Sequence, residues 1–386
     1  MCNKSLPLSL PGSGDQGSFE SNGILPPESS FVKPISDESF EKYRISVFNG
    51  YFLQGYARKL VHEIFPFRDN INYCKCGIIP VSAFVSVFRH SEFRRASFNG
   101  VVTCANPFLC PVCAPRIMGR RSSEIKQAVH QWLSESEENT CYLLTLTFRH
   151  SINDSLRSMF SNMKTALKSF WSDRSIKAMF SDAGRIGRVT AFEITFSSVS
   201  GWHPHEHILI FCKKFNFDHL VLNERWKNAL KRSKLSGLSG IALDLIEARS
   251  CDKYLQKISA EMALSNCKQG RGSGSFAPFQ LLAAYADGQS WAGDRFKELF
   301  KVYSQSHLHP LQWSRGLKSR FGIVDVSDSD IVENRVDPLV LWSMIPAPVY
   351  RKLSAFDKAF LRICAAIGDK DRFVSYFARI GARAGR

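Results

Sequence analysis

Alternating apolar and polar residues mark several short stretches of the chain. In CYLLTLTF, residues 141–148, Leu144 and Leu146 alternate with Thr145 and Thr147. Because successive side chains of a strand point to opposite faces, this stretch predicts a strand with one apolar face and one hydroxyl face.

Apolar residues spaced three or four positions apart predict amphipathic helices over residues 115–133, 156–170 and 217–234. The first of these helices is basic. Its exposed side is expected to carry Arg116, Arg120 and Arg121, which would grip nucleic-acid phosphates.

Residues 188–211, RVTAFEITFSSVSGWHPHEHILIF, predict a β-hairpin. The apolar residues of its two strands are Phe192, Ile194 and Phe196, then Ile208 and Ile210. If these residues share one face of the sheet, the register puts Glu193 on the opposite face, beside the histidines of the second strand. Those histidines are His203, His205 and His207, in a chain that has ten.

The histidines at alternate positions predict a metal site. A strand sends alternate side chains to one face, so the imidazoles of a His-x-His pair lie close enough to share one ion. Imidazoles with a carboxylate, and with no cysteine to close a tetrahedron, suit a catalytic divalent ion better than a structural one. Glu193 and His203 are the candidates for a third ligand, and the geometry favours Glu193. The alternative is a set of hydrogen-bonded histidines lining a polar cleft.

Five cysteines in two clusters predict a structural zinc site. Cys74 and Cys76 stand in NYCKCG, and Cys104, Cys110 and Cys113 stand in TCANPFLCPVCAPR. A tetrahedral zinc requires four thiolates, and the five cysteines supply them. In a chain of 386 residues that opens on no secretion signal, thiols or metal ligands are expected rather than disulfides. The alternative is that these are scattered buried cysteines.

The charge balance points to a polyanionic partner. The chain has 51 Lys and Arg against 35 Asp and Glu, a formal net charge of +16, which favours nucleic acid or an anionic membrane surface. The longest apolar stretch, PLVLWSMIPAPVY, is interrupted by prolines and is shorter than the ~20 residues of a membrane span. We therefore expect a cytoplasmic protein that binds DNA and no membrane. Further DNA contacts are expected from Lys268 and Arg271 in CKQGRGSGS and from Arg315 and Lys318 in LQWSRGLKSRFG.

A tyrosine and a lysine in CDKYLQKISAEMA complete the candidate chemistry. Tyr254 and Lys257 lie three residues apart, on one side of a predicted helix. A tyrosine hydroxyl near a metal-bound phosphate can act as a nucleophile, and a nearby lysine stabilises its phenolate. Taken alone, the pair is equally well explained as a half-buried tyrosine beside a solvated lysine.

The order of these motifs resembles that of the rolling-circle plasmid replication initiators of the HUH endonuclease superfamily. CPVCA is followed by a basic helix, then by LLTLTF, GWHPHEHILIF and YLQK, with PFQLL and LQWSRGL further along. The resemblance extends from about Cys104 to Lys318. It implies an α+β fold, with the His-x-His strand in a central antiparallel sheet and helices packed on one side. A zinc-binding cysteine region and a helical C-terminal segment complete the expected architecture.

The resemblance also implies the roles of the site residues. His205 and His207 would bind Mg²⁺ or Mn²⁺, Tyr254 would be the nucleophile, and Lys257 would assist it. Tyr254 would attack a phosphodiester in the plasmid's double-strand origin, remain joined to the 5′ phosphate, and leave a 3′ hydroxyl for the host polymerase. A second transesterification or hydrolysis would then release a closed single strand. Origin DNA, the host helicase and the host polymerase are the implied partners.

Two positions depart from the family pattern. The residue between the ligand histidines is usually apolar, but here it is Glu206, on the face assigned to the core. Either that end of the sheet is solvated, or the register is shifted by one residue and Glu206 joins the site. Some relatives also have a carboxylate four residues before the tyrosine, where this chain has Ser250. In this chain that carboxylate would have to come from Glu247, Asp252 or Glu261, or from a second copy of the protein.

These features divide the chain into four parts. They are a disordered tail (1–38), a cysteine-rich zinc-binding region with the basic helix (39–135), the nicking domain (136–320) and a helical C-terminal segment of unassigned role (321–386).

Three other functions stay open. A mobilisation relaxase or transposase of the same superfamily would share the chemistry and differ in its target. A non-catalytic, zinc-containing DNA-binding regulator would use the basic helix on phosphates, with structural histidines. A metal-dependent hydrolase of small molecules ranks last, because His219, His307 and His309 lack recognisable ligand spacing.

Overall fold

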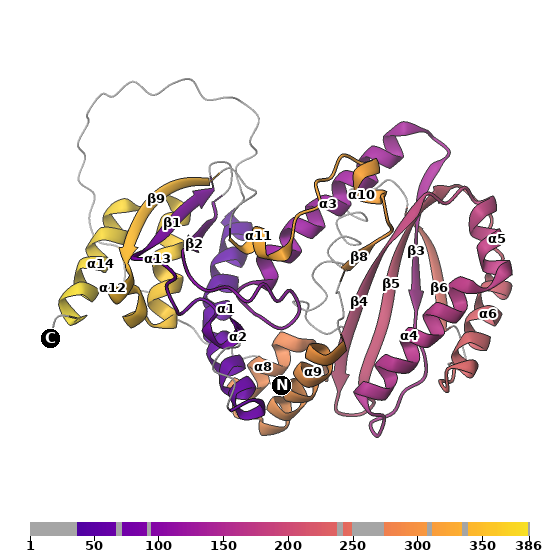
Figure 1. Ribbon diagram of the computed structural model, residues 1–386, viewed down its shortest axis with the longest axis horizontal. Helices are drawn as coiled ribbons and strands as arrows, with labels where there is room; N and C mark the ends of the chain where they lie inside the picture. The colour runs from indigo at the N-terminus through magenta and orange to yellow at the C-terminus, as the bar shows by residue number, and fades with distance from the viewer. Residues whose placement is uncertain are drawn as a thin grey trace. The chain divides into compact units, whose positions relative to one another are not determined.

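The computed structural model describes residues 37–66, 72–90, 94–237, 242–248, 274–306, 311–333 and 339–384. The chain divides into a unit of residues 1–34 and a unit of residues 35–386, and every described helix and strand belongs to the second unit (Figure 1). The predicted tail lies outside the described residues up to residue 36, and the first helix begins at Asp37.

The histidine strand lies in the middle of an antiparallel sheet, which we call the large sheet. Among the described residues its order is β6-β3-β5-β4-β7, and β8 pairs with another part of β4. The strands are β3 (Asn139–Leu146), β4 (Gly187–Ser197), β5 (Gly201–Lys213), β6 (Leu243–Ala248), β7 (Ser275–Phe276) and β8 (Leu311–Trp313). The sheet confirms the predicted α+β class and the central place of the His-x-His strand.

Helices cover both faces of the large sheet (Figure 1). One face shares a core with α4 (Leu156–Ser172), α5 (Arg174–Asp182), α6 (His219–Arg232), α8 (Pro278–Ala286) and α9 (Ser290–Ser306). On the other face, α3 (Ala114–Glu135) packs Ile125 and Val129 in one core with Leu209 and Phe211 of β5. The basic helix therefore adds a layer on the face that the histidines also share.

A second, small sheet joins distant parts of the chain. It contains β1 (Phe84–His90), β2 (Ala96–Asn99) and β9 (Leu339–Pro346), in the order β2-β1-β9. The helices α12 (Ala347–Lys352), α13 (Ala355–Ile367) and α14 (Lys370–Ala384) follow β9, and α13 packs on β1 and β2 around Val85, Ile345 and Leu361. The cysteine-rich region and the C-terminal segment, which the sequence separates, thus share one sheet.

The long helix α1 (Asp37–Ile64) connects the two cores. Val47 and Tyr51 pack in the core of the small sheet, whereas Leu60 and Val61 pack in the core of the large sheet. The remaining short helices are α2 (Asn72–Lys75), α10 (Leu317–Arg320) and α11 (Asp328–Val332). Among the described residues, no helix combines the length and the apolar character that crossing a membrane requires.

Periodicity located the elements that it predicted within the described residues. The predicted strand 141–148 is β3, and the predicted helices 115–133, 156–170 and 217–234 are α3, α4 and α6. The start of α6 has a local cause, because the Asp218 side chain accepts the first backbone N–H groups of the helix, from Leu220 and Val221, at 3.0 Å each.

Candidate functional site

The hairpin of β4 and β5 sets the register of the candidate metal site. Gly201 begins β5 with a φ of +79°, and a Cβ there would lie 2.8 Å from the carbonyl oxygen of Ser151, so only glycine fits this position. The pairing that follows places Glu193 opposite His205. This is the register that the sequence predicts.

Glu193, His205 and His207 converge on one point. The Oε2 atom of Glu193 lies 2.9 Å from Nε2 of His205 and 2.8 Å from Nε2 of His207. Burial alone raises the pKa of Glu193, but the hydrogen bonds from both imidazoles outweigh it and hold that pKa well below its usual range. Their ligand atoms all lie within 4.8 Å of one another, so the three side chains can hold a metal ion. Nitrogen and oxygen donors of this kind suit a divalent cation.

Thr145 orients one of these imidazoles. It pairs with His207 across β3 and β5, and its hydroxyl lies 3.1 Å from Nδ1 of His207. A contact at Nδ1 fixes the ring and directs Nε2 toward Glu193, which is the usual arrangement behind a metal-binding histidine. The sequence identified the hydroxyl face of this strand but assigned Thr145 no role. By contrast, Nδ1 of His205 is buried and has no hydrogen-bond partner among the described residues.

His203 lies beside the three converging side chains and not among them. Nδ1 of His150 donates to the carbonyl oxygen of Ser200 at 2.9 Å, which leaves Nε2 of His150 facing Nδ1 of His203. Burial, together with the neighbouring His205 and His150 rings, lowers the pKa of His203 to about 4. His150 ends the LLTLTFRH stretch, and nothing in the sequence pattern singled it out.

Glu206 does not join the histidines. It pairs with Phe192, which faces the core of the large sheet, so the register is not shifted. The side chain is largely buried on that face, and burial raises its pKa to about 7, with Arg188 opposing the change.

Two other carboxylates lie on β6. Glu247 pairs with Tyr142 on the core face, and its Oε1 accepts a hydrogen bond from Thr140 at 3.1 Å. Asp244 is exposed and pairs with Thr145, so Asp244, Thr145 and His207 form one row across three strands. Asp244 therefore lies on the histidine face, which the sequence did not reveal.

Four of the five candidate zinc ligands are gathered in one cluster. The Sγ atom of Cys76 lies 3.5 Å from that of Cys113 and 3.8 Å from that of Cys110, and Cys104 lies 3.8 Å from Cys113. Four sulfurs around a zinc ion with bonds of about 2.3 Å are about 3.8 Å apart, so the cluster fits a tetrahedral site. Cys74 is not part of this group.

Neighbouring donors fit thiolate ligands. The backbone N–H of Cys113 points at Sγ of Cys110 at 3.5 Å, and the side-chain amide of Gln54 reaches the same sulfur at 3.7 Å. Cys113 is also the N-cap residue of α3. A metal held here would fix the start of the basic helix to α1 and to the loop after α2.

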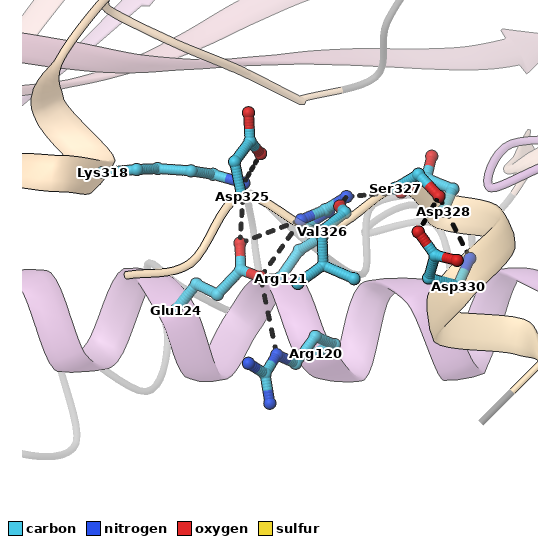
Figure 2. A network of polar contacts seen from close by, with 9 residues as sticks. All are labelled: Arg120, Arg121, Glu124, Lys318, Asp325, Val326, Ser327, Asp328 and Asp330. Atoms are coloured by element: carbon cyan, nitrogen blue, oxygen red, sulfur yellow. Dashed lines mark hydrogen bonds and ion pairs between the residues drawn. The ribbon is translucent and has the colours of Figure 1, made fainter. Parts of the chain in front are cut away.

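The expectation that α3 exposes three arginines is wrong. The guanidinium of Arg121 is only 12% exposed and pairs with Glu124 at 3.1 Å and with Asp328 at 2.7 Å (Figure 2). Arg120 pairs with the same Glu124 at 3.5 Å, and Arg116 is partly buried, with its pKa lowered to about 10 chiefly by burial and then by nearby Arg362. An acidic segment from much later in the chain covers this side of the helix.

The other expected DNA contacts divide into two groups. Lys318 is 13% exposed and pairs with Glu124 at 3.3 Å and with Asp325 at 2.8 Å (Figure 2). Arg315, by contrast, is exposed. The remaining predicted residues, Tyr254, Lys257, Lys268 and Arg271, lie outside the described residues, as do Ser250, Asp252 and Glu261.

Comparisons with known proteins find similarity in the region around the site. Residues 95–237 match the family model described as replication protein. "Protein rep" of Streptomyces lividans is 29% identical over 137 residues, covering 29% of this chain and 30% of that protein. "Neomycin resistance protein" of Streptomyces cyanogenus is 30% identical over 148 residues, covering 32% of this chain and 33% of that protein. The chain thus spans about a third of the length of these relatives, and no solved structure matches it.

The matched region begins one residue before β2 and ends beyond α6. It contains the cysteines of the second cluster, the strand of Thr145, and the hairpin that carries Glu193 and the histidines. The comparisons thus support the resemblance to replication initiators over the part of the chain that builds the candidate metal site, since residues 95–237 match the replication-protein family model.

Proposed function

We propose that this chain initiates rolling-circle replication of a plasmid by nicking one strand of its origin DNA. The observation that carries the proposal is the convergence of Glu193, His205 and His207 in the large sheet, within the region that matches the replication-protein family model. The reaction is a transesterification, and we assign it to residues 136–320. Zinc at Cys76, Cys104, Cys110 and Cys113 would be structural, within the region 39–135.

The side chains of the site fit a divalent ion such as Mg²⁺ or Mn²⁺. Glu193 supplies an oxygen, and His205 and His207 supply nitrogens from one face of the sheet. When bound there, the ion would withdraw charge from the phosphodiester. Thr145 holds the ring of His207 in place through Nδ1. Glu193 keeps a negative charge at neutral pH, because the two imidazoles lower its pKa.

Tyr254 is the proposed nucleophile. Its hydroxyl loses a proton and the oxygen forms a bond to phosphorus while the bond from phosphorus to the 3′ oxygen breaks; the departing 3′ oxygen takes up one proton, so the exchange is balanced. The products are a 5′-phosphotyrosine and a free 3′ hydroxyl, which the host polymerase would extend behind the host helicase in the cytoplasm. Lys257 would stabilise the phenolate of Tyr254. For the hydrolytic end of the cycle, Asp244 is a better candidate base than Glu247, because it lies on the histidine face.

A covalent-adduct assay tests this proposal. The protein is incubated with Mn²⁺ and single-stranded or supercoiled DNA of its own plasmid, then analysed on a denaturing gel. A DNA-shifted protein band is expected from the parent, and none from Tyr254→Phe, which loses only a hydroxyl. His205→Ala should lose the band without losing DNA binding.

Three results would contradict the proposal. An adduct that persists in Tyr254→Phe would exclude this tyrosine as the nucleophile. No adduct on any fragment, with DNA binding retained, would favour a non-catalytic, zinc-containing regulator. Cleavage only at a transfer origin or a transposon end would indicate the relaxase or transposase of the same superfamily.

A further inference from the structure

The C-terminal helices carry a large share of the chain's positive charge. Residues 339–386 contain nine lysines and arginines against three aspartates, a net charge of +6 out of +16 for the whole chain. Of the three α3 arginines from which the sequence predicts DNA contacts, Arg120 and Arg121 are paired with carboxylates of the same chain (Figure 2), and Arg116 is partly buried. A search for the DNA-facing surface therefore leads to the small sheet and its helices.

Helices α13 and α14 form a helix-turn-helix pair. Gly368 ends α13 with a φ of +79°, and the side chain of Asp369 accepts the backbone N–H of Arg372 at 2.9 Å at the start of α14. The turn consists of Gly368 and Asp369, which is within the range of two to five residues that joins paired helices. On α14, Phe373 and Ile380 are buried in the core of the small sheet.

The opposite side of α14 presents cations to solvent. Arg372, Ser375 and Arg379 are all exposed and lie on one side of the helix, by their spacing of three to four residues. The two arginines are seven residues apart, or about 10 Å along the axis, comparable with the ~12 Å width of the DNA major groove.

Aromatic rings hold these arginines outward. The guanidinium of Arg372 lies 5.3 Å from the ring centre of Phe360, and that of Arg379 lies 5.6 Å from that of Tyr376. The two rings pack on each other with centres 4.2 Å apart. Stacking of this kind restricts a guanidinium and lowers the entropy lost when it binds a phosphate.

The cations continue onto the strand that the helix pair covers. A guanidinium nitrogen of Arg89 in β1 lies 2.8 Å from the point where a Cβ on Gly368 would sit, so Arg89 is against the turn between the helices. Lys370 at the start of α14 donates to the carbonyl oxygen of Trp342 at 2.6 Å. Of the three aspartates here, Asp357 accepts a hydrogen bond from the hydroxyl of Tyr376 at 2.7 Å, Asp369 caps the helix, and Asp371 is exposed in the first turn of α14.

We propose that α14 is a duplex-DNA contact helix, with Arg372 and Arg379 on the backbone phosphates that flank one groove. A helix seated in the major groove is the usual docking mode of the second helix of such a pair. The inference rests on the proposed function only in taking origin DNA as the natural duplex. It gives the C-terminal segment a role separate from nicking: it holds the double-stranded DNA while the metal site acts on one strand.

Fluorescence anisotropy with a 30-base-pair duplex and with a single-stranded 30-mer tests this role. The full-length double variant Arg372→Ala/Arg379→Ala should bind the duplex about tenfold more weakly. The slope of log K against log [salt] should fall by about 2, because each lost phosphate contact removes about 0.9. Adduct formation on single-stranded DNA of its own plasmid should be unchanged, which separates this proposal from the proposed function.

Two matched variants make the result specific. Lys164→Ala/Lys168→Ala removes the same charge from exposed positions of α4 and should leave duplex affinity within about threefold of the parent. Arg372→Lys/Arg379→Lys keeps the charge and should retain most of the binding, which rules out loss through misfolding. The proposal is overturned if the alanine variant binds the duplex normally, if the α4 variant loses as much, or if binding to the single strand falls equally.

Discussion

At the scale of single residues, the candidate metal site depends on a hydroxyl as well as on its three ligands. Thr145→Val keeps the shape of the side chain but removes the contact to Nδ1 of His207. Loss of such an outer contact typically costs 10- to 100-fold in metal affinity. We therefore expect Mn²⁺ binding, measured by titration calorimetry, to weaken about tenfold or more, with the melting temperature nearly unchanged.

Thr147→Val is the matched control for that measurement. Thr147 lies one residue beyond the end of β3, and its hydroxyl is buried with no hydrogen-bond partner among the described residues. Replacing it should leave Mn²⁺ affinity unaltered and stability equal or slightly higher, since an unsatisfied buried hydroxyl is removed. Equal Mn²⁺ affinities for Thr145→Val and the parent protein would show that His207 needs no support from β3.

At the scale of elements, the features that could be predicted from the sequence are those that follow from the local pattern of apolar and polar residues. The alternation in β3, β4 and β5 and the hairpin register were predictable, because the face of each residue follows from its parity along the strand. The position of Asp244 in the row with Thr145 and His207 was not predictable from local pattern, because Asp244 reaches the histidine face through the pairing of β6 with β3. The identity of the fourth cysteine ligand likewise depended on the fold, since Cys76 and Cys110 are 34 residues apart.

The residues that pack on α3 could not be predicted from the local sequence pattern. Its arginines look solvent-facing in the sequence, yet the partner of Arg121 is Asp328, 207 residues later. The acidic stretch 325–330 covers the helix and converts expected DNA contacts into internal ion pairs (Figure 2). Helical periodicity shows which residues share a side, but not what packs on that side.

The buried carboxylate at the centre of this network allows a stability test. Glu124 is 2% exposed and forms ion pairs with Arg120, Arg121 and Lys318. Removing one partner of a buried ion pair leaves uncompensated charge and typically costs about 3–5 kcal/mol. Glu124→Ala should therefore lower the free energy of unfolding in urea by about 3 kcal/mol.

Asp325→Asn gives the comparison for Glu124→Ala. Asp325 contacts the same Lys318, but its side chain is 84% exposed, so the pair is worth less than about 1 kcal/mol. Similar losses for the two variants would mean that the network contributes through surface charge and that Glu124 is not its centre.

At the scale of the whole molecule, α1 is the element shared by both cores. Its first half packs with the small sheet and its second half with the large sheet. Gln54, near the middle of α1, is buried and donates a hydrogen bond to the carbonyl oxygen of Cys76 at 3.1 Å. The cysteine cluster is therefore also attached to α1. A continuous helix should therefore make the two cores unfold together, although only the large sheet carries the candidate metal site.

Gly55 offers a direct test of this coupling. It is exposed in the middle of α1, and a Cβ there would have no atom within 4 Å outside its own helix. Gly55→Ala should raise the melting temperature, because alanine favours the helix by about 1 kcal/mol over glycine. Gly55→Pro removes one helical hydrogen bond and forces a clash with the preceding turn, at a cost of about 3 kcal/mol or more. In scanning calorimetry, the parent and the alanine variant should melt in one transition and the proline variant in two. A single transition in all three proteins, lowered only for proline, would show that contacts other than α1 couple the cores, such as the hydrogen bond from Tyr350 to the carbonyl oxygen of Gly77.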